Sequence, residues 1–198
     1  MMLKKTGVFI LLIIVLCCVF LLNGCGTIIF LPKTNIRTGT WVGDVYANQW
    51  ANITFTLPSD YNSIKINAFE VPGQIQDFLF VNNDQSLVVS LTYVILSDKT
   101  QKGQTAEDYL NIVKQQLAAS ANKNYIFAND FETVIIAGEE YIVMRSEFSF
   151  KETPTVTINY QDGYVRKFDN VFIVFIITYT DDTKESADSF LSAITQIN

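Results

Sequence analysis

The chain has 198 residues, which is enough for one domain with a single substantial core. Hydrophobic residues make up 49% of it and charged residues 17%, a balance typical of a folding sequence and not of a disordered one. The formal net charge is −6, and the part from Cys25 onward, with 12 basic and 20 acidic residues, carries −8. Such an acidic surface repels phosphate backbones and anionic headgroups, which argues against nucleic-acid binding.

Two further features of the composition narrow the possible chemistry. The sequence contains no histidine, the commonest general base and transition-metal ligand in proteins. Its three cysteines, Cys17, Cys18 and Cys25, all lie in the N-terminal segment. The rest of the chain therefore offers no disulfide, thiol nucleophile or cysteine-ligated zinc site. We expect no metal, no cofactor and no enzymatic activity.

The N-terminus has the form of an export signal. Met1–Lys5 is a short basic region, and Val8–Leu22 is an unbroken apolar run, short for a membrane span of about 20 residues. Leu22-Asn23-Gly24-Cys25 follows, and this tetrapeptide resembles the bacterial lipobox, although Asn23 departs from the small or aliphatic residue usual at its position. The resemblance implies cleavage before Cys25 and a diacylglyceryl anchor on its thiol, with a signal peptide over residues 1–24.

An uncut transmembrane helix is the alternative for this segment, because no charged residue occurs between Lys5 and Lys33. Asn23, Gly24 and Gly26 interrupt such a helix where a signal peptide should end, which favours the lipoprotein. Both interpretations place the domain at the extracellular face of the cell membrane with the basic N-terminus inside.

Residues 25–38 are expected to form the lipidated cysteine and a tether, and residues 39–198 a single extracellular domain. Its predicted first strands are Thr40–Tyr46 and Trp50–Leu57, joined through Ala47-Asn48-Gln49. Residues 61–75 are expected to be a loop with a turn at Pro72-Gly73.

Two further strands, Asp77–Val81 and Leu87–Leu96, are predicted before a middle helix. Ser97–Gly103 is expected to be a loop, and Thr105 with Asp108 forms a loose capping box for the helix behind it. The apolar stripe predicted for this helix consists of Tyr109, Ile112, Val113, Gln116 and Leu117.

The remainder is predicted to be a meander that ends in a helix. The expected strands are Phe131–Ile136, Tyr141–Phe150, Thr155–Tyr160, Tyr164–Phe168 and Val171–Thr180, with turns at Ala137-Gly138, Asp162-Gly163 and Asp169-Asn170. Val171–Tyr179 (VFIVFIITY) is apolar on both faces, which predicts a central strand that is covered on each side. Asp182 and Glu185 are expected to cap a last helix over Thr183–Ile197, whose stripe is Ala187, Phe190, Leu191, Ile194 and Ile197. This order of elements predicts an α+β fold: an antiparallel sheet meander with a middle and a C-terminal helix packed on it.

The opening of the domain resembles a known group of proteins. The runs Gly39–Tyr46 (GTWVGDVY) and Ala51–Pro58 (ANITFTLP) look like the start of uncharacterised Gram-positive lipoproteins, with Tyr61 where such sequences often carry Trp. The order of elements over residues 39–198 is similar to the PsbP-like fold, named from the photosystem II extrinsic protein. The resemblance implies an adaptor or binding module and offers no catalytic residues.

Aromatic residues near the opening strands are the candidate binding surface. Trp41, Tyr46, Trp50 and Tyr61 could stack against sugar faces, but aromatic residues also favour the sheet core. The acidic pairs Glu139-Glu140 and Asp181-Asp182 are weak candidates for calcium or glycosidase chemistry, since neighbours on a strand point to opposite faces.

A non-catalytic, lipid-anchored envelope module that binds a protein partner or an envelope component is the leading hypothesis. An enzyme acting on envelope polymers and a carrier of a small apolar ligand, held between sheet and helix, are the alternatives.

Overall fold

The computed structural model describes residues 36–57, 64–66, 69–71, 73–82, 86–97, 99–120, 123–150 and 158–197. For residues 64–66, 69 and 71 the backbone alone is described. All of these residues belong to one compact unit, Leu31–Asn198. The predicted signal peptide, Cys25, most of the tether and Tyr61 lie outside the described residues. None of the helices in the described part of the chain has the length and hydrophobicity that a membrane crossing needs.

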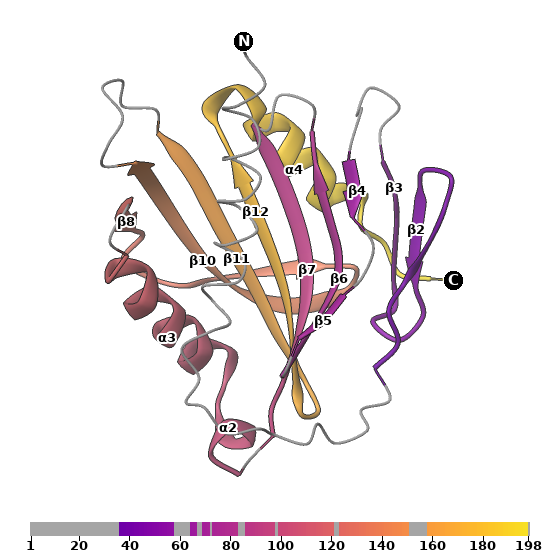
Figure 1. Cartoon of the computed structure of the whole chain (residues 1–198), viewed down its shortest axis with the longest axis horizontal. Helices are drawn as coiled ribbons and strands as arrows, with labels where there is room; N and C mark the ends of the chain where they lie inside the picture. The colour runs from indigo at the N-terminus through magenta and orange to yellow at the C-terminus, as the bar shows by residue number, and fades with distance from the viewer. Residues whose placement is uncertain are drawn as a thin grey trace. The chain divides into compact units, whose positions relative to one another are not determined.

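A large antiparallel sheet forms the body of the unit (Figure 1). Within the described residues it has nine strands, in the spatial order β4-β6-β7-β12-β11-β10-β8, with β5 paired to β6 and β9 paired to β10. Their bounds are β4 Ile64–Ile66, β5 Phe69–Val71, β6 Gln74–Val81, β7 Leu87–Ile95, β8 Lys123–Phe127, β9 Glu132–Ile136, β10 Glu139–Phe150, β11 Asn159–Phe168 and β12 Val171–Tyr179. The fold is therefore α+β with an antiparallel sheet, as the sequence predicts.

Strand β12 is central, and both of its faces are covered. It pairs with β7 on one side and β11 on the other, and Phe172, Ile173, Val174 and Phe175 are all buried. Side chains at odd positions, such as Phe175, join the main hydrophobic core. Phe172, at an even position, packs instead against Tyr109 of the middle helix, with 4.9 Å between ring centroids. The central placement of this strand is confirmed.

A separate small sheet, not anticipated from the sequence, covers part of the core face. It consists of β1 Thr40–Val42, β2 Val45–Asn48 and β3 Ile53–Thr56. The single strand predicted over Thr40–Tyr46 is wrong, because Gly43, at φ +60°, turns the chain between β1 and β2. The connection predicted at Ala47–Gln49 lies later, since β2 continues to Asn48, whose Oδ1 accepts from the Ala51 amide at 2.9 Å.

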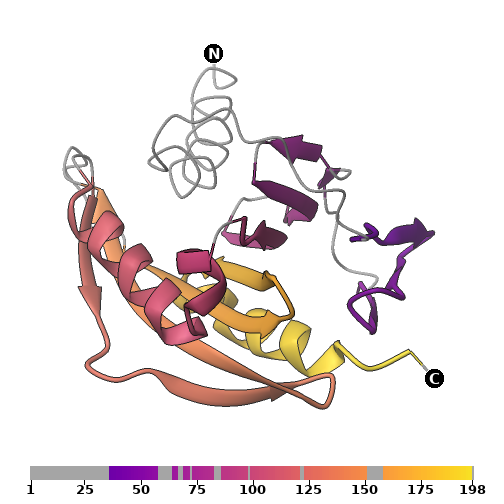
Figure 2. The ribbon, with the colours of Figure 1, turned by 90° about the horizontal axis from the view of Figure 1, so that it is seen from below.

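The middle helix, α3 (Ala106–Ala118), packs on the face of the large sheet opposite to the small sheet and the main core (Figure 2). The predicted capping box is confirmed: Thr105 Oγ1 accepts from the Asp108 amide, and Asp108 accepts from the Thr105 amide. The buried stripe is Leu110, Val113 and Leu117, which corrects the predicted stripe because Ile112 is exposed.

The C-terminal helix, α4 (Lys184–Ala193), follows a short 3-10 turn, Asp181–Thr183. Ala187 and Phe190 are buried in the main core, as predicted, together with Ile194 beyond the helix end. The predicted cap from Asp182 and Glu185 is wrong. Thr183 Oγ1 instead accepts from the Thr180 amide at 3.0 Å and donates to the Ser86 carbonyl at 2.8 Å, which fixes where the helix begins.

Other differences arise where tertiary pairing overrides local signals. Strand β11 runs unbroken through the predicted Asp162-Gly163 turn, because it pairs with β10 and β12 along its length. The predicted loops at residues 61–75 and Ser97–Gly103 contain β4, β5 and the helix α2 (Lys99–Gly103). Strand β8 was not predicted, and its pairing with β10 places it at the end of the described sheet.

Candidate functional site

The predicted aromatic surface lies largely between the two sheets. Tyr46 is completely buried, which corrects its assignment to a binding surface. Trp41 is partly buried against Tyr46, Phe55 and Phe78, with centroids 5.1 to 6.1 Å apart. Trp50 is partly buried between Tyr93 and Phe168. Tyr61 lies outside the described residues. Packing between the sheets therefore accounts for most of this cluster.

A buried carboxylate anchors that packing. Asp77 accepts hydrogen bonds from the Gly39 amide at 2.8 Å, from Asn48 Nδ2 at 2.6 Å, and from the hydroxyls of Tyr46 and Tyr93 at 2.5 and 2.6 Å. Burial, and then the negative charge of Asp77, raises the pKa of Tyr46 well above its usual value, so the phenol stays protonated as a donor. With four donors to one carboxylate, this cluster satisfies a buried charge and has a structural role.

A cleft of about 520 Å³ lies beside α4, on the face of the large sheet that carries the main hydrophobic core. It is the candidate site. Its lining comes from strands β8, β10, β11 and β12, from the residue after β8 and from helix α4. The residues are Ile126, Phe127, Ala128, Arg145, Ser146, Glu147, Tyr160, Asp162, Tyr179, Lys184 and Asp188.

Strand register explains which side chains form the floor of the cleft. Ile126 of β8 lies opposite Glu147 of β10, Glu147 opposite Tyr160 of β11, and Tyr160 opposite Tyr179 of β12. Directly paired residues point to the same face of a sheet, so these four side chains form one row. Arg145 and Asp162, two residues along their strands, form the next row on the same face.

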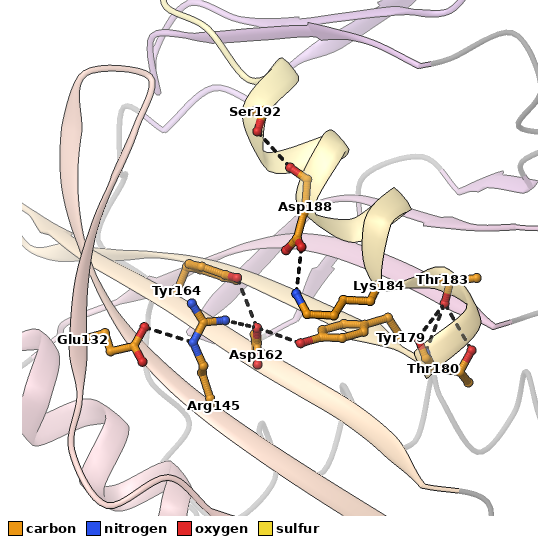
Figure 3. Close-up of polar contacts among 10 residues, drawn as sticks. All are labelled: Glu132, Arg145, Asp162, Tyr164, Tyr179, Thr180, Thr183, Lys184, Asp188 and Ser192. Atoms are coloured by element: carbon orange, nitrogen blue, oxygen red, sulfur yellow. Dashed lines mark hydrogen bonds and ion pairs between the residues drawn. The ribbon is translucent and has the colours of Figure 1, made fainter.

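An ion-pair network crosses the second row (Figure 3). Arg145 donates from Nη1 to Asp162 Oδ2 at 2.6 Å and from Nε to Glu132 Oε2 at 3.0 Å. The hydroxyls of Tyr164 and Tyr179 donate to the same Asp162 oxygen, at 3.2 and 3.3 Å. These contacts hold the guanidinium in one orientation before any ligand arrives.

Asp162 is the buried polar group of the cleft. It is 2% exposed, and in the described part of the chain its Oδ1 has no hydrogen-bond partner. Burial raises the pKa of this carboxyl, while Arg145, Tyr164 and Tyr179 act in the opposite direction. An unsatisfied buried oxygen costs free energy, and this cost adds to the effect of burial on the carboxyl.

Helix α4 forms the wall of the cleft. Lys184 and Asp188 lie one turn apart on it and form an exposed ion pair at 2.7 Å, visible in Figure 3. The buried side of the helix fixes this wall, because Phe190 packs against Phe55 and Phe80 with centroids 4.9 and 5.2 Å apart.

Sequence reasoning missed this cleft. Asp162 was assigned to a turn, and Arg145, Tyr160 and Lys184 were not singled out. One signal was present: Tyr160, Asp162 and Tyr164 alternate within one strand and so share a face. That pattern places an acid between two tyrosines, but it does not say which strand lies beside it.

Comparisons with known proteins support the fold and leave function open. No protein-family model matches the sequence, and no curated protein matches it. The solution structure of the cyanobacterial PsbP protein CyanoP from Synechocystis is similar over 89% of this chain and 99% of that one, with a TM-score of 0.50 and 15% identity. At that identity the likeness establishes a PsbP-like fold alone.

Two further solved structures are similar at lower scores. A protein from Bacteroides thetaiotaomicron has a TM-score of 0.46 and 13% identity over 79% of this chain, which spans about half, 49%, of that protein. LpqN, described as involved in cell envelope biogenesis of Mycobacterium tuberculosis, has a TM-score of 0.43 and 12% identity over 74% of this chain and 83% of that one.

Proposed function

We propose that this chain is a lipid-anchored, non-catalytic binding module of the cell envelope, held at the outer face of the membrane through Cys25. The cleft beside α4 is its ligand-binding site. The observation that carries the proposal is that this cleft is already formed, with polar side chains held in place by the protein itself.

The preformed lining supports binding. Glu132 and Asp162 hold Arg145 from two sides, and tertiary packing fixes α4, so a ligand meets groups that lose little freedom when they bind it. The volume of about 520 Å³ is within the range usual for small-ligand sites.

The distribution of carboxyl groups favours binding over glycoside hydrolysis. A hydrolase of that kind pairs a carboxyl whose pKa is raised by burial with an ionised one across the scissile bond. Asp162 is the one buried acid among the three that line the cleft. Its Oδ2 is bound by Arg145 and two tyrosine hydroxyls, and its Oδ1 has no accessible surface, so neither oxygen can give a proton to a bound substrate. The exposed Glu147 and Asp188 therefore have no buried acid to work with. Five of the eleven residues in the lining are charged, so a ligand that offers hydrogen bonds fits better than a purely apolar one.

The N-terminal sequence supports the anchor. Leu22–Cys25 has the spacing of a lipobox, and the chain from Cys25 to Ile36, which packs against the core, could extend over at most roughly 40 Å. A tether of that reach would let the domain stand clear of the lipid headgroups. An anchor with two acyl chains would be stable, whereas one chain alone binds reversibly.

The anchor is tested by replacing the cysteine. Cys25→Ala should abolish incorporation of labelled fatty acid, leave the precursor uncut and remove the mature form from the membrane fraction. Cys18→Ala is the matched control and should be labelled and processed normally. Processing and labelling of Cys25→Ala at the wild-type level would show that the chain is not a lipoprotein of this type.

The binding site is tested by co-sedimentation of the purified full chain with delipidated envelope preparations from its own cells, so that the N-terminal anchor alone does not retain the chain. Lys184→Glu reverses an exposed charge on the wall of the cleft and should lower the retained fraction several-fold. Lys102→Glu reverses an exposed charge on α2, away from the cleft, and should leave retention unchanged. Equal retention of the two variants would place binding elsewhere on the molecule.

A further inference from the structure

Tyr160 is an aromatic side chain held in position on the floor of the cleft. Its ring stacks on Tyr179, with centroids 5.2 Å apart and 17° between the planes. Its hydroxyl is hydrogen-bonded to Asp181, and this bond raises its pKa. The side chain is half-buried and lines the cavity. A ring fixed in this way is a platform that costs little entropy to use.

Hydrogen-bonding groups of both kinds surround that ring. Arg145 uses Nε and Nη1 within the protein, and among the described residues its Nη2 has no partner. Lys184 is a second donor, while Glu147 and Asp188 are exposed acceptors. Asp162 Oδ1, buried beneath them, is an acceptor whose hydrogen bond is unmade.

The charges of the lining nearly balance. Two cations, Arg145 and Lys184, face three carboxylates, those of Glu147, Asp162 and Asp188. A polyanionic ligand needs an excess of cationic groups, which this lining lacks. A purely apolar ligand would take the charged groups of the lining out of water without offering them hydrogen bonds. Sugar hydroxyls both donate and accept, and the C–H face of a sugar ring packs on an aromatic ring.

We propose that the cleft binds a neutral saccharide, a hexose or N-acetylhexosamine unit stacked on Tyr160. Its hydroxyls bond to Arg145 and to the exposed carboxylates of Glu147 and Asp188. This proposal rests on the proposed binding function and names its ligand class. The sequence pointed to Trp41 and Tyr46 as a surface for stacking sugars, but these two side chains pack between the sheets. Tyr160, which lines the cleft, takes that role in this proposal.

Direct binding of neutral oligosaccharides tests the proposal. The purified full chain would be titrated with chitotriose, cellotriose and maltotriose by calorimetry and saturation-transfer NMR. At least one should bind. Tyr160→Ala should weaken that binding at least tenfold, since stacking is lost, while Tyr160→Phe keeps the ring and should stay within about threefold. Phe168→Ala, which removes an aromatic ring outside the cleft that is 41% exposed, should have no effect.

Tyr160→Ala also removes the contact with Tyr179, so a second pair of variants tests the cleft without changing that packing. Ile126 and Ile135 are 68% and 66% exposed, so substitution of either leaves the core intact. Ile126→Arg places a long side chain on the floor of the cleft and should abolish binding, whereas Ile135→Arg on β9 should not.

Three outcomes would overturn the saccharide assignment. They are the absence of binding by all three sugars at millimolar concentration, equal binding by the Ile126 and Ile135 variants, and displacement of the sugar by a lysine-containing tripeptide that binds more tightly. Persistent co-sedimentation with envelopes in the first case would leave the proposed function standing and reject the saccharide alone.

Discussion

Asp162 is a buried carboxylate whose two oxygens have different surroundings. Oδ2 accepts from Arg145, Tyr164 and Tyr179, whereas Oδ1 has no partner among the described residues. A fully paired carboxylate would have a lowered pKa, but burial outweighs the partners here and raises the pKa of Asp162 above its usual 3.8. Asp162 therefore holds Arg145 in place while part of its own hydrogen-bonding capacity stays unsatisfied.

The raised pKa predicts how stability depends on pH. The folded protein holds the Asp162 proton more tightly than the unfolded chain, so the contribution of Asp162 to the free energy of unfolding is greatest below pH 3.8. It falls as the pH rises from that value through the folded-state pKa. Asp162→Asn cannot ionise, and its stability relative to wild type should therefore increase across this window and then level off.

Urea denaturation of both proteins between pH 3.5 and pH 8, at constant ionic strength, measures this difference. NMR titration of the Asp162 carboxyl carbon gives the folded-state pKa directly. A difference that stays constant with pH, or a carboxyl that titrates below pH 3.8, would contradict the prediction.

Helix α4 contacts both sheets and so connects them. Phe190 packs on Phe55 of the small sheet and Phe80 of the large one. Beyond the helix, Thr195 exchanges backbone hydrogen bonds with Thr54 of β3, at 2.8 and 2.9 Å. A helix of ten residues is marginal alone, so its stability comes from this packing.

Removal of residues 183–198 should therefore expose the hydrophobic core and cause aggregation or rapid proteolysis. Removal of residues 197 and 198 alone keeps Phe190 and the Thr54–Thr195 bridge, and this shorter chain should stay folded. Size-exclusion chromatography and thermal melting compare the two. A monomeric long truncation with an unchanged Tm would show that α4 is dispensable.

Across the whole unit, the large and small sheets are joined by the polar cluster around Asp77 and by the aromatic side chains packed between them. Asp77 of the large sheet accepts from Gly39, Tyr46 and Asn48 on the chain of the small sheet. A Cβ at Gly39 would collide with the Tyr46 ring, which is completely buried and whose hydroxyl is bound to Asp77. The ring therefore has no room to move away.

Gly39→Ala should destabilise the protein by about 1–3 kcal/mol, the usual cost of overpacking a core. Gly103→Ala is the control, because nothing lies within 4 Å of a Cβ there, and it should be neutral or slightly stabilising. Denaturation midpoints measure both. A Gly39 variant as stable as the Gly103 variant would show that the interface between the sheets can adjust.

The sequence by itself determined the elements whose signals are local. The capping box at Thr105 and Asp108, the turn at Ala137-Gly138 and the apolar run of β12 each depend on residues a few positions apart. Hydrophobic period, cap chemistry and turn residues act over that range, so they could be predicted without knowing the partner strands. The α+β class followed from their order.

Only the tertiary structure decided the small sheet, the run of β11 through Asp162-Gly163 and the cleft itself. Pairing of β11 with strands on both sides overrides the turn tendency of Asp-Gly. Arg145, Asp162 and Lys184 come from three elements, and strand register and helix docking bring them together. Tyr46 and Tyr160 are the same residue type, yet one is core and the other lines the cleft, because burial depends on what covers a side chain and not on its neighbours in the sequence.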